Sequence, residues 1–152
     1  MGGIPQGEVI SVKFFQIKIL EDEKSLKKHA DASEIYIEIT VFCKEDMVIK
    51  DTTWIKNIEQ FAELIRFMDN KKLKKYTVNF LDNPIEIIFT KLNEYIEYEV
   101  RTFYGEFNCK IKKQNIKDDV IYEIEKALEE IQSKNERFMK DPFLQKIYRI
   151  IS

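Results

Sequence analysis

Apolar residues recur at steps of four and three residues between Trp54 and Met68, a spacing that places them on one face of a helix. The stripe consists of Trp54, Ile58, Phe61, Ile65 and Met68. Residues 51–53, Asp-Thr-Thr, offer side-chain oxygens that can cap the first amides of such a helix. The pattern predicts an amphipathic helix that begins at Trp54 and packs its apolar stripe, Trp54 included, against a sheet.

Segments of a different period flank this helix. Apolar and polar residues alternate in them, which is typical of half-buried strands. The predicted strands are 12–20, 34–43, 47–50, 76–81, 85–92, 95–103 and 106–111. In the first of them, Phe15, Ile17 and Ile19 share one face and Phe14 lies on the other. Residues 21–32 carry mixed charge without alternation and are predicted to form a loop or a short exposed turn.

A second helix is expected from about Lys117, where Asp118 and Asp119 suit the positive end of the helix dipole. Its apolar stripe is Val120, Ile121, Ile124, Ala127, Leu128 and Ile131, with Glu123, Glu125, Lys126, Glu129 and Glu130 placed away from it. Asp141 followed by Pro142 predicts the capped start of a short terminal helix.

Together these elements predict an α+β fold built as one two-layer domain. We expect a largely antiparallel sheet of about six or seven strands with two long helices on one face, in the order βββαββββα plus a short C-terminal helix. A chain of 152 residues fits a single domain, 1–152, with a flexible segment 1–11 and a C-terminal helical extension 133–152.

Composition narrows the classes of function. Basic and acidic residues nearly cancel, with a formal net charge of −2, which argues against a general nucleic-acid binder. The sequence has neither a stretch with the apolar length of a membrane span nor a recognisable signal peptide, so a cytoplasmic location without membrane association is expected. Cys43 and Cys109 fall on apolar strand registers and are predicted to be free core cysteines.

Few residues offer candidate chemistry. His29 is the only histidine and lies between charged residues of the predicted loop, so we interpret it as a solvated side chain. The tight Cys or His pairs of metal sites and the glycine-rich turns of nucleotide sites are missing from the sequence, and we expect neither a metal nor a cofactor. Four lysines within residues 71–75 could contact phosphate, but a solvated helix end is the simpler interpretation.

Four glutamates, Glu86, Glu97, Glu99 and Glu106, are predicted on the outward face of neighbouring strands. Three interpretations are open for them. They could be the polar side that a sheet shows to water, paired carboxylates for acid–base hydrolysis, or an acidic surface that recognises a basic partner. Repulsion among four neighbouring carboxylates, unless solvent or a basic partner screens it, is the reason for proposing them as the contact surface.

Residues 51–65, in which a threonine–tryptophan pair is followed by phenylalanine and leucine, resemble a pattern of the WapI-type immunity proteins. The strand 105–111 and the helix 117–131 are similar to the closing strand and helix of that family, and the resemblance spans about 12–131. It implies a small cytoplasmic protein that binds and neutralises a toxin domain without chemistry of its own. The resemblance supplies no binding residues, because such proteins recognise toxins through surfaces particular to each pair.

The sequence therefore favours a non-catalytic protein-binding module, most simply an immunity-type protein. A small scaffold or regulatory subunit that binds a cellular protein is the alternative, and a small hydrolase using paired carboxylates is the third. The partner and the oligomeric state are not encoded in any motif.

Overall fold

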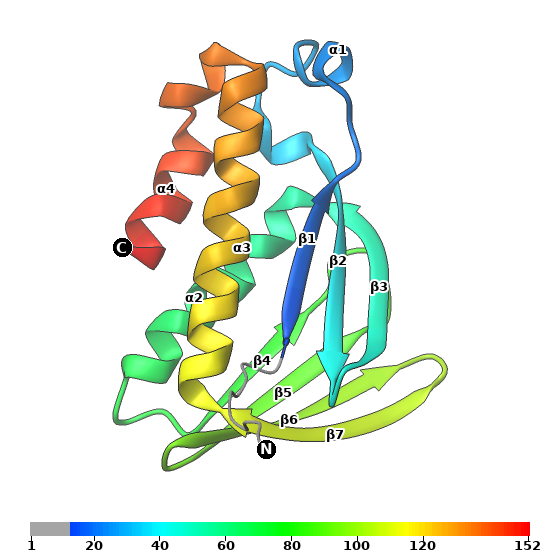
Figure 1. Ribbon diagram of the computed structural model, residues 1–152, viewed down its shortest axis with the longest axis vertical. Coiled ribbons are helices and arrows are strands. Elements are labelled where there is room, and N and C mark those ends of the chain that lie inside the picture. The colour runs from blue at the N-terminus through cyan, green and yellow to red at the C-terminus, as the bar shows by residue number, and fades with distance from the viewer. Residues whose placement is uncertain (1–12) are drawn as a thin grey trace, which may run out of the picture.

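The computed structural model describes residues 13–152 and shows an α+β arrangement of two antiparallel sheets and four α-helices (Figure 1). The first sheet has the order β1-β2-β3, and the second has the order β4-β5-β6-β7. The strands are β1 (Phe15–Ile19), β2 (Tyr36–Cys43), β3 (Asp46–Trp54), β4 (Lys75–Asn79), β5 (Glu86–Leu92), β6 (Tyr95–Thr102) and β7 (Gly105–Lys112). The α+β class is confirmed, whereas the prediction of one continuous sheet is wrong.

Two long and two short α-helices complete the fold. They are α1 (Glu23–Leu26), α2 (Ile58–Asp69), α3 (Lys113–Lys134) and α4 (Pro142–Ile151), and 3-10 turns occupy Ala32–Glu34, Ile55–Asn57 and Glu136–Lys140. The helix α1, a single turn, lies within 21–32, where a loop or a short exposed turn is predicted, and the first 3-10 turn begins at the last residue of that range. The predicted flexible segment 1–11, and Val12 with it, lie outside the described residues.

The start of α2 corrects one prediction. Residues 51–53 belong to strand β3 and do not cap a helix, because the strand continues to Trp54 and α2 begins at Ile58. Trp54 is therefore a half-buried strand residue whose ring stacks on Tyr36, with 4.2 Å between the ring centroids. The remainder of the predicted stripe is confirmed, since Ile58, Phe61, Ile65 and Met68 are all buried.

The two sheets and the helices share one continuous hydrophobic cluster. Phe61 of α2 lies against Phe15 of β1 with 4.5 Å between ring centroids. Phe14, predicted to face away from Phe15, is also buried and packs edge-on against Phe89 and Tyr98 of the second sheet. Phe14 can do so because it precedes the regular part of β1, where side chains begin to alternate strictly.

Helix α3 runs beside strand β1, which is an edge strand of the three-stranded sheet (Figure 1). Its carboxylates bind the outward amides of that edge: Asp119 Oδ2 accepts from Phe14 N at 2.6 Å and from Phe15 N at 3.1 Å, and Glu123 Oε1 accepts from Ile17 N at 3.0 Å. Glu123 is only 2% exposed. Its predicted placement away from the core is wrong because the helix covers an edge as well as a face.

The predicted start is wrong for helix α3 and right for helix α4. Helix α3 begins at Lys113, so Asp118 and Asp119 lie in its second turn and not at its start. At α4 the predicted cap is confirmed, because Asp141 Oδ1 accepts from the amides of Phe143 and Leu144. Buried Leu144, Ile147, Ile150 and Ile151 line this helix. Helix α4 packs chiefly against α2.

Within residues 13–152, no helix combines the length and the apolar composition needed to cross a membrane.

Candidate protein-binding surface

The four predicted glutamates share the outer face of the four-stranded sheet. Glu86, Arg101 and Glu106 are in register across β5, β6 and β7, and Glu97 and Glu99 alternate along β6 on the same side. Side chains directly opposite one another in antiparallel strands point to the same face. The intervening side chains of these strands face the core, so the outward register predicted from sequence matches the register of the structure.

This face is not acidic, because basic side chains balance the glutamates. Arg101 lies between two of them, with Nε 2.9 Å from Glu99 Oε2 and Nη1 3.4 Å from Glu86 Oε1. The hydrogen bond from Arg101 is the main reason that the pKa of Glu99 lies below its ordinary value. Four basic residues share the face with the four glutamates: Lys75, Arg101, Lys110 and Lys112. Basic side chains of the same chain therefore screen the repulsion expected among the four glutamates, and the surface is one of mixed charge.

The environment of the glutamates on this face does not suit them to general acid catalysis. A carboxyl that acts as a general acid near neutral pH needs a raised pKa in a desolvated cleft. Glu99 has a lowered pKa, and Glu97 is exposed on an open sheet face. The arrangement is suited to forming exchangeable ion pairs across an interface, a contribution that acts mainly on association rate and specificity.

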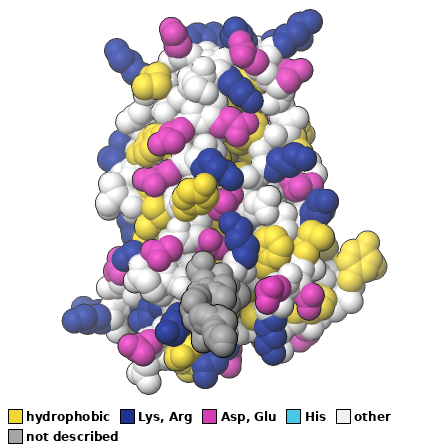
Figure 2. Space-filling model, viewed as in Figure 1, with side chains coloured by type: hydrophobic (Ala, Val, Ile, Leu, Met, Phe, Trp, Pro, Cys, Tyr) yellow, Lys and Arg dark blue, Asp and Glu magenta, His cyan; other side chains and the backbone are white. Residues whose placement is uncertain are grey.

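The hairpin between β6 and β7 presents two large apolar side chains next to this face. Phe103 is 83% exposed and Tyr104 is 91% exposed, and their rings meet edge-on at 5.5 Å. The turn is fixed by a hydrogen bond of 3.0 Å from Tyr104 N to Thr102 Oγ1 and by Gly105, whose φ of 147° favours glycine. Hydrophobic side chains protrude at the right-hand edge of Figure 2, where Figure 1 places this hairpin.

From the sequence, Phe103 is the last residue of the predicted strand 95–103 and Tyr104 and Gly105 connect it to the next strand, so neither aromatic residue receives a functional role. The signal was present, because two successive aromatic residues at a hairpin tip have no core to enter. Exposed aromatic side chains beside a polar rim are the usual anchors of protein interfaces. We call Phe103 and Tyr104 together the aromatic tip.

A groove of about 430 Å³ separates the aromatic tip from strand β3. One wall is formed by β3 residues Val48 to Asp51, and the other by the tip and by the turn between β4 and β5. Its lining includes Ile49, Asp51, Pro84, Ile85, Phe103 and Tyr104. The groove is mostly apolar on the side of the turn and the tip, with a carboxylate on the side of β3.

Asp51 is incompletely satisfied in this groove. Its Oδ1 accepts a 2.7 Å hydrogen bond from Asn83 Nδ2, whereas Oδ2 is buried without a partner within residues 13–152. Burial raises the pKa of the Asp51 carboxyl, the Asn83 hydrogen bond opposes this, and the charge of nearby Asp82 adds to it. A buried acceptor without a donor costs about 1 to 3 kcal/mol. The unsatisfied Oδ2 therefore opposes the stability that the Asn83 hydrogen bond contributes.

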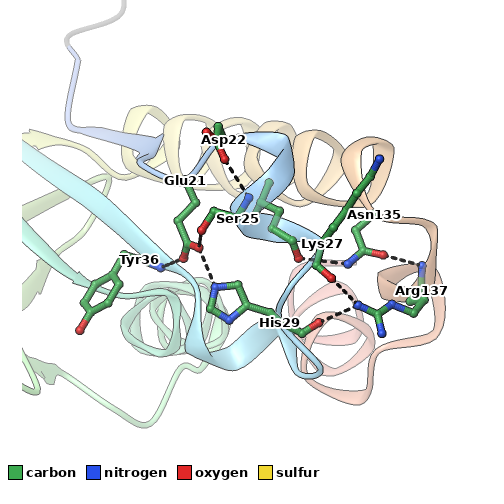
Figure 3. A network of polar contacts seen from close by, with 9 residues as sticks. Glu21, Asp22, Ser25, Lys27, His29, Tyr36, Asn135 and Arg137 are labelled. Carbon is green, nitrogen blue, oxygen red and sulfur yellow. Dashed lines mark hydrogen bonds and ion pairs between the residues drawn. The ribbon is translucent and has the colours of Figure 1, made fainter.

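The predicted loop at His29 contains a second polar cluster, which is centred on Glu21 (Figure 3). Glu21 Oε1 accepts from Ser25 Oγ at 2.5 Å and lies 2.6 Å from His29 Nε2, and Oε2 accepts from Tyr36 N at 2.8 Å. Burial alone would raise the pKa of Glu21, but these hydrogen bonds outweigh it and lower the pKa. The prediction of a solvated His29 is wrong, because its ring is partly buried against this carboxylate.

Ser, His and Glu are the residue types of a nucleophilic triad, but their order of contact here is different. In a triad the histidine lies between the hydroxyl and the carboxylate. Ser25 and His29 instead bind the same oxygen of Glu21, and Tyr36 N–H binds the other. Figure 3 shows the carboxylate at the centre, joining α1 to the start of β2. The cluster therefore orders the backbone between β1 and β2.

The two cysteines are confirmed as buried and unpaired. Cys43 of β2 and Cys109 of β7 meet where the two sheets touch, and Cys43 Sγ donates to Asn108 O at 3.4 Å. Burial, together with the neighbouring Cys109 thiol, raises the pKa of Cys43 to about 12. A thiol with such a pKa is unreactive at neutral pH.

Metal binding would require several His, Cys, Asp or Glu side chains to converge. In the described part of the chain, no group of three or more such residues lies close enough together to hold an ion.

No protein-family model matches this chain, and neither a curated protein nor a solved structure matches it significantly.

Proposed function

We propose that this chain is a non-catalytic protein-binding module whose contact surface combines the aromatic tip with the adjoining mixed-charge sheet face. The observation that carries the proposal is the exposure of Phe103 and Tyr104, at 83% and 91%. Two aromatic side chains held in water by a well-ordered turn gain free energy when a partner covers them. The charged residues beside them, beginning with the Arg101 and Glu106 pair, would form the polar rim of such an interface.

The partner that we propose is a toxin domain, which this chain would bind and neutralise in the cytoplasm. The resemblance of residues 51–65 and 105–131 to WapI-type immunity proteins supports this choice of partner, and the near-neutral charge of the chain fits a protein partner better than nucleic acid. A scaffold or regulatory subunit that binds a cellular protein is the second candidate, because the aromatic tip would serve either role. A hydrolase using paired carboxylates is less well supported, since the pKa of Glu99 is lowered.

The test begins with affinity capture from cells that naturally contain this chain, followed by identification and purification of the captured partner. The double variant Phe103→Ser with Tyr104→Ser should bind the purified partner at least about 30-fold more weakly, the loss typical of an interface hot spot. Tyr122→Ser is the matched control, because Tyr122 is also an exposed aromatic residue but lies on α3. An unchanged affinity in a folded tip variant would contradict the proposed surface.

The nature of the partner is tested separately. Expression of the partner alone should arrest growth, and coexpression of this chain should restore it. A captured partner that is harmless when expressed alone would instead favour the scaffold or regulatory role.

The sheet face is tested through its charges. Glu97→Lys with Glu99→Lys converts the balanced face into a strongly basic one, so the association rate should change and its salt dependence should increase. Screening acts over roughly 10 Å at 0.1 M salt. If association by the folded double variant keeps the parent rate and salt dependence, the interface is confined to the aromatic tip.

A further inference from the structure

Strand β3 has an open edge, and the hydrogen-bond pattern identifies which of its backbone groups face that edge. Phe42 N donates to Phe14 O and Leu20 N donates to Tyr36 O, so the even-numbered residues of β2 direct their backbone groups towards β1. The odd-numbered residues of β2 therefore face β3. Their register partners on β3 also have odd numbers, as in the pair of Ile39 with Asp51.

The amides and carbonyls of Lys50 and Thr52, which have even numbers, consequently point away from the sheet. Among the described residues, no hydrogen bond to the backbone groups of Lys50 or Thr52 is formed from the edge side. An unpaired strand edge is a template on which another extended segment can add as a further strand. The edge at β3 is not blocked by a helix in the way that α3 covers β1 (Figure 1).

The groove described above lies beside residues Val48 to Asp51 of β3 and so includes Lys50 and ends next to Thr52. A segment that paired with Lys50 and Thr52 would lie between β3 and the wall made by the β4–β5 turn and the aromatic tip. Side chains of an added strand point alternately to opposite faces of the sheet. Those on the inner side would contact Pro84, Ile85 and the aromatic tip, so main-chain pairing and apolar contact would occur together.

Charge favours a basic side chain in this segment. Asp51 Oδ2 has no partner among the described residues, and Asp82 lies near enough to raise the pKa of Asp51. Lys50 also lines the groove, but its side chain points to the outer face of β3, in register with Thr40. A lysine or arginine on the inner side of the added strand would supply the donor that Asp51 lacks.

Pairing with a second copy of the chain would not supply a basic group to Asp51. In a two-fold antiparallel pairing through Lys50 and Thr52, even-numbered residues of β3 face even-numbered residues of the other copy, so Asp51 faces Met47, Ile49, Asp51 or Thr53 of that copy. None of these side chains is basic. A segment of a different chain is therefore the occupant that can place a lysine or arginine on Asp51.

We propose that the edge of β3 binds an extended segment of a partner protein by strand addition, with a lysine or arginine of that segment on Asp51 and apolar residues against the aromatic tip. This inference rests on the proposed function for the existence of a protein partner and adds the form that its recognised segment takes.

The probe is a displayed library of random peptides about twelve residues long, enough to span a strand of ordinary length. Selection on the full chain should enrich peptides in which apolar and polar residues alternate and which carry a lysine or arginine at one fixed position. Binding of an enriched peptide should slow amide exchange at Lys50 and Thr52 by about tenfold or more, because these amides become hydrogen-bonded.

A pair of variants at one position isolates the main-chain contact. Thr52→Pro removes an N–H that points away from β2, a position at which an edge strand accepts proline. Thr52→Val keeps the N–H and is the matched control. We expect Thr52→Pro to weaken peptide binding about tenfold and Thr52→Val to retain it. Asp51→Asn should weaken only peptides that carry the basic residue.

Four outcomes would overturn the inference: equal binding by folded Thr52→Pro and Thr52→Val, enriched peptides without exchange protection at Lys50 and Thr52, an enriched set without a basic position, or self-association of the chain that Thr52→Pro abolishes. If Thr52→Pro does not fold, the exchange measurement on the unmodified chain decides. The proposed function is tested separately with the natural partner. If that partner binds Thr52→Pro normally but binds the tip variant more weakly, the proposed function stands and strand addition at β3 is contradicted.

Discussion

The two edges of the three-stranded sheet are treated in opposite ways. At β1, carboxylates of α3 accept the outward amides, with Asp119 on Phe14 and Phe15 and Glu123 on Ile17. Beyond the end of β1, Glu21 accepts the amide of Tyr36 in the same manner. At β3, within residues 13–152, nothing pairs with the outward groups of Lys50 and Thr52. One edge is used to build the fold, and the other is left accessible.

The carboxylates at the two edges differ accordingly. Those at β1 receive several hydrogen bonds, and the pKa of Glu21 is lowered by them. The carboxylate at β3, Asp51, has one oxygen without a partner among the described residues, and burial raises its pKa. The ionised form of Glu21 therefore favours folding, whereas the ionised form of Asp51 opposes it.

The largest expected effect is at Glu123. Glu123→Ala leaves the buried amide of Ile17 without an acceptor and Lys13 without its closest ion-pair partner, which lies 3.1 Å away. The free energy of unfolding should fall by about 3 kcal/mol, as measured by denaturant titration. Glu123→Gln, which retains an acceptor oxygen, should lose about 1 kcal/mol. Glu125→Ala, at an exposed position on the same helix, is the control. Equal denaturant midpoints for the two alanine variants would contradict the capping of the β1 edge by Glu123.

A smaller loss is expected at Asp119, which is partly exposed. Asp119→Ala removes the acceptor for the amides of Phe14 and Phe15 and should lower the free energy of unfolding by about 1 to 2 kcal/mol. The neighbouring Asp118 is exposed, and its side chain accepts a hydrogen bond only from Gln114 among the described residues, so Asp118→Ala is a matched control with an expected change within about 0.5 kcal/mol. A loss at Asp118 as large as that at Asp119 would show that helix propensity, and not edge capping, is being measured.

The closed edge should also be sensitive to acid through Glu21. The pKa of Glu21 in the folded state lies below that of an ordinary glutamate, so its contribution to stability is present above the ordinary pKa and is lost as the pH falls through the folded-state pKa. Glu21→Gln should cost about 1 kcal/mol at neutral pH, and the difference from the parent should shrink as the pH falls below about 4.5. Thermal unfolding followed across this range measures the effect. If the difference in unfolding free energy between the parent and Glu21→Gln is the same at all pH values, the charge of Glu21 does not contribute to stability.

The sequence predicted those features that depend on neighbouring residues. Period-two and helical patterns located all seven strands and the buried face of α2, because side-chain alternation is a local property. Trp54 was misassigned because it lies four residues before Ile58, a spacing that fits a helical stripe as well as the end of a strand. The division into two sheets could not be derived, since strand pairing is set by long-range packing.

Neither the carboxylates that cap the β1 edge nor the groove beside β3 could be predicted, because both depend on contacts between distant parts of the sequence. Glu123 differs from its exposed helical neighbours through its contacts with Ile17 and Lys13, which lie 106 and 110 residues away in the sequence. The groove is assembled from β3, the β4–β5 turn and the β6–β7 hairpin, and no single segment signals it. The four glutamates were correctly placed on one face, but their neutralisation by Arg101 depends on the register of three strands. Only the aromatic tip carried a local signal.

The smallest expected effect, and the one that sharpens the contrast most, is at Asp51. Because the folded state raises the pKa of Asp51, its ionised form opposes folding, and this opposition disappears as the pH falls through the raised value. Asp51→Asn keeps an oxygen for the Asn83 hydrogen bond and removes the charge beside Asp82.

The Asn variant should therefore unfold at neutral pH with a free energy equal to that of the parent or up to about 0.5 kcal/mol higher. As the pH is lowered, the free energy of unfolding of the parent should rise relative to that of Asp51→Asn, whereas at Glu21 the parent should lose stability relative to its variant. A loss at pH 7 as large as that of Asp119→Ala would mean that Asp51 stabilises the fold and would end the distinction between the two edges. Preserved stability combined with weakened binding of a basic peptide would instead show that a carboxylate which the fold does not need is retained for recognition.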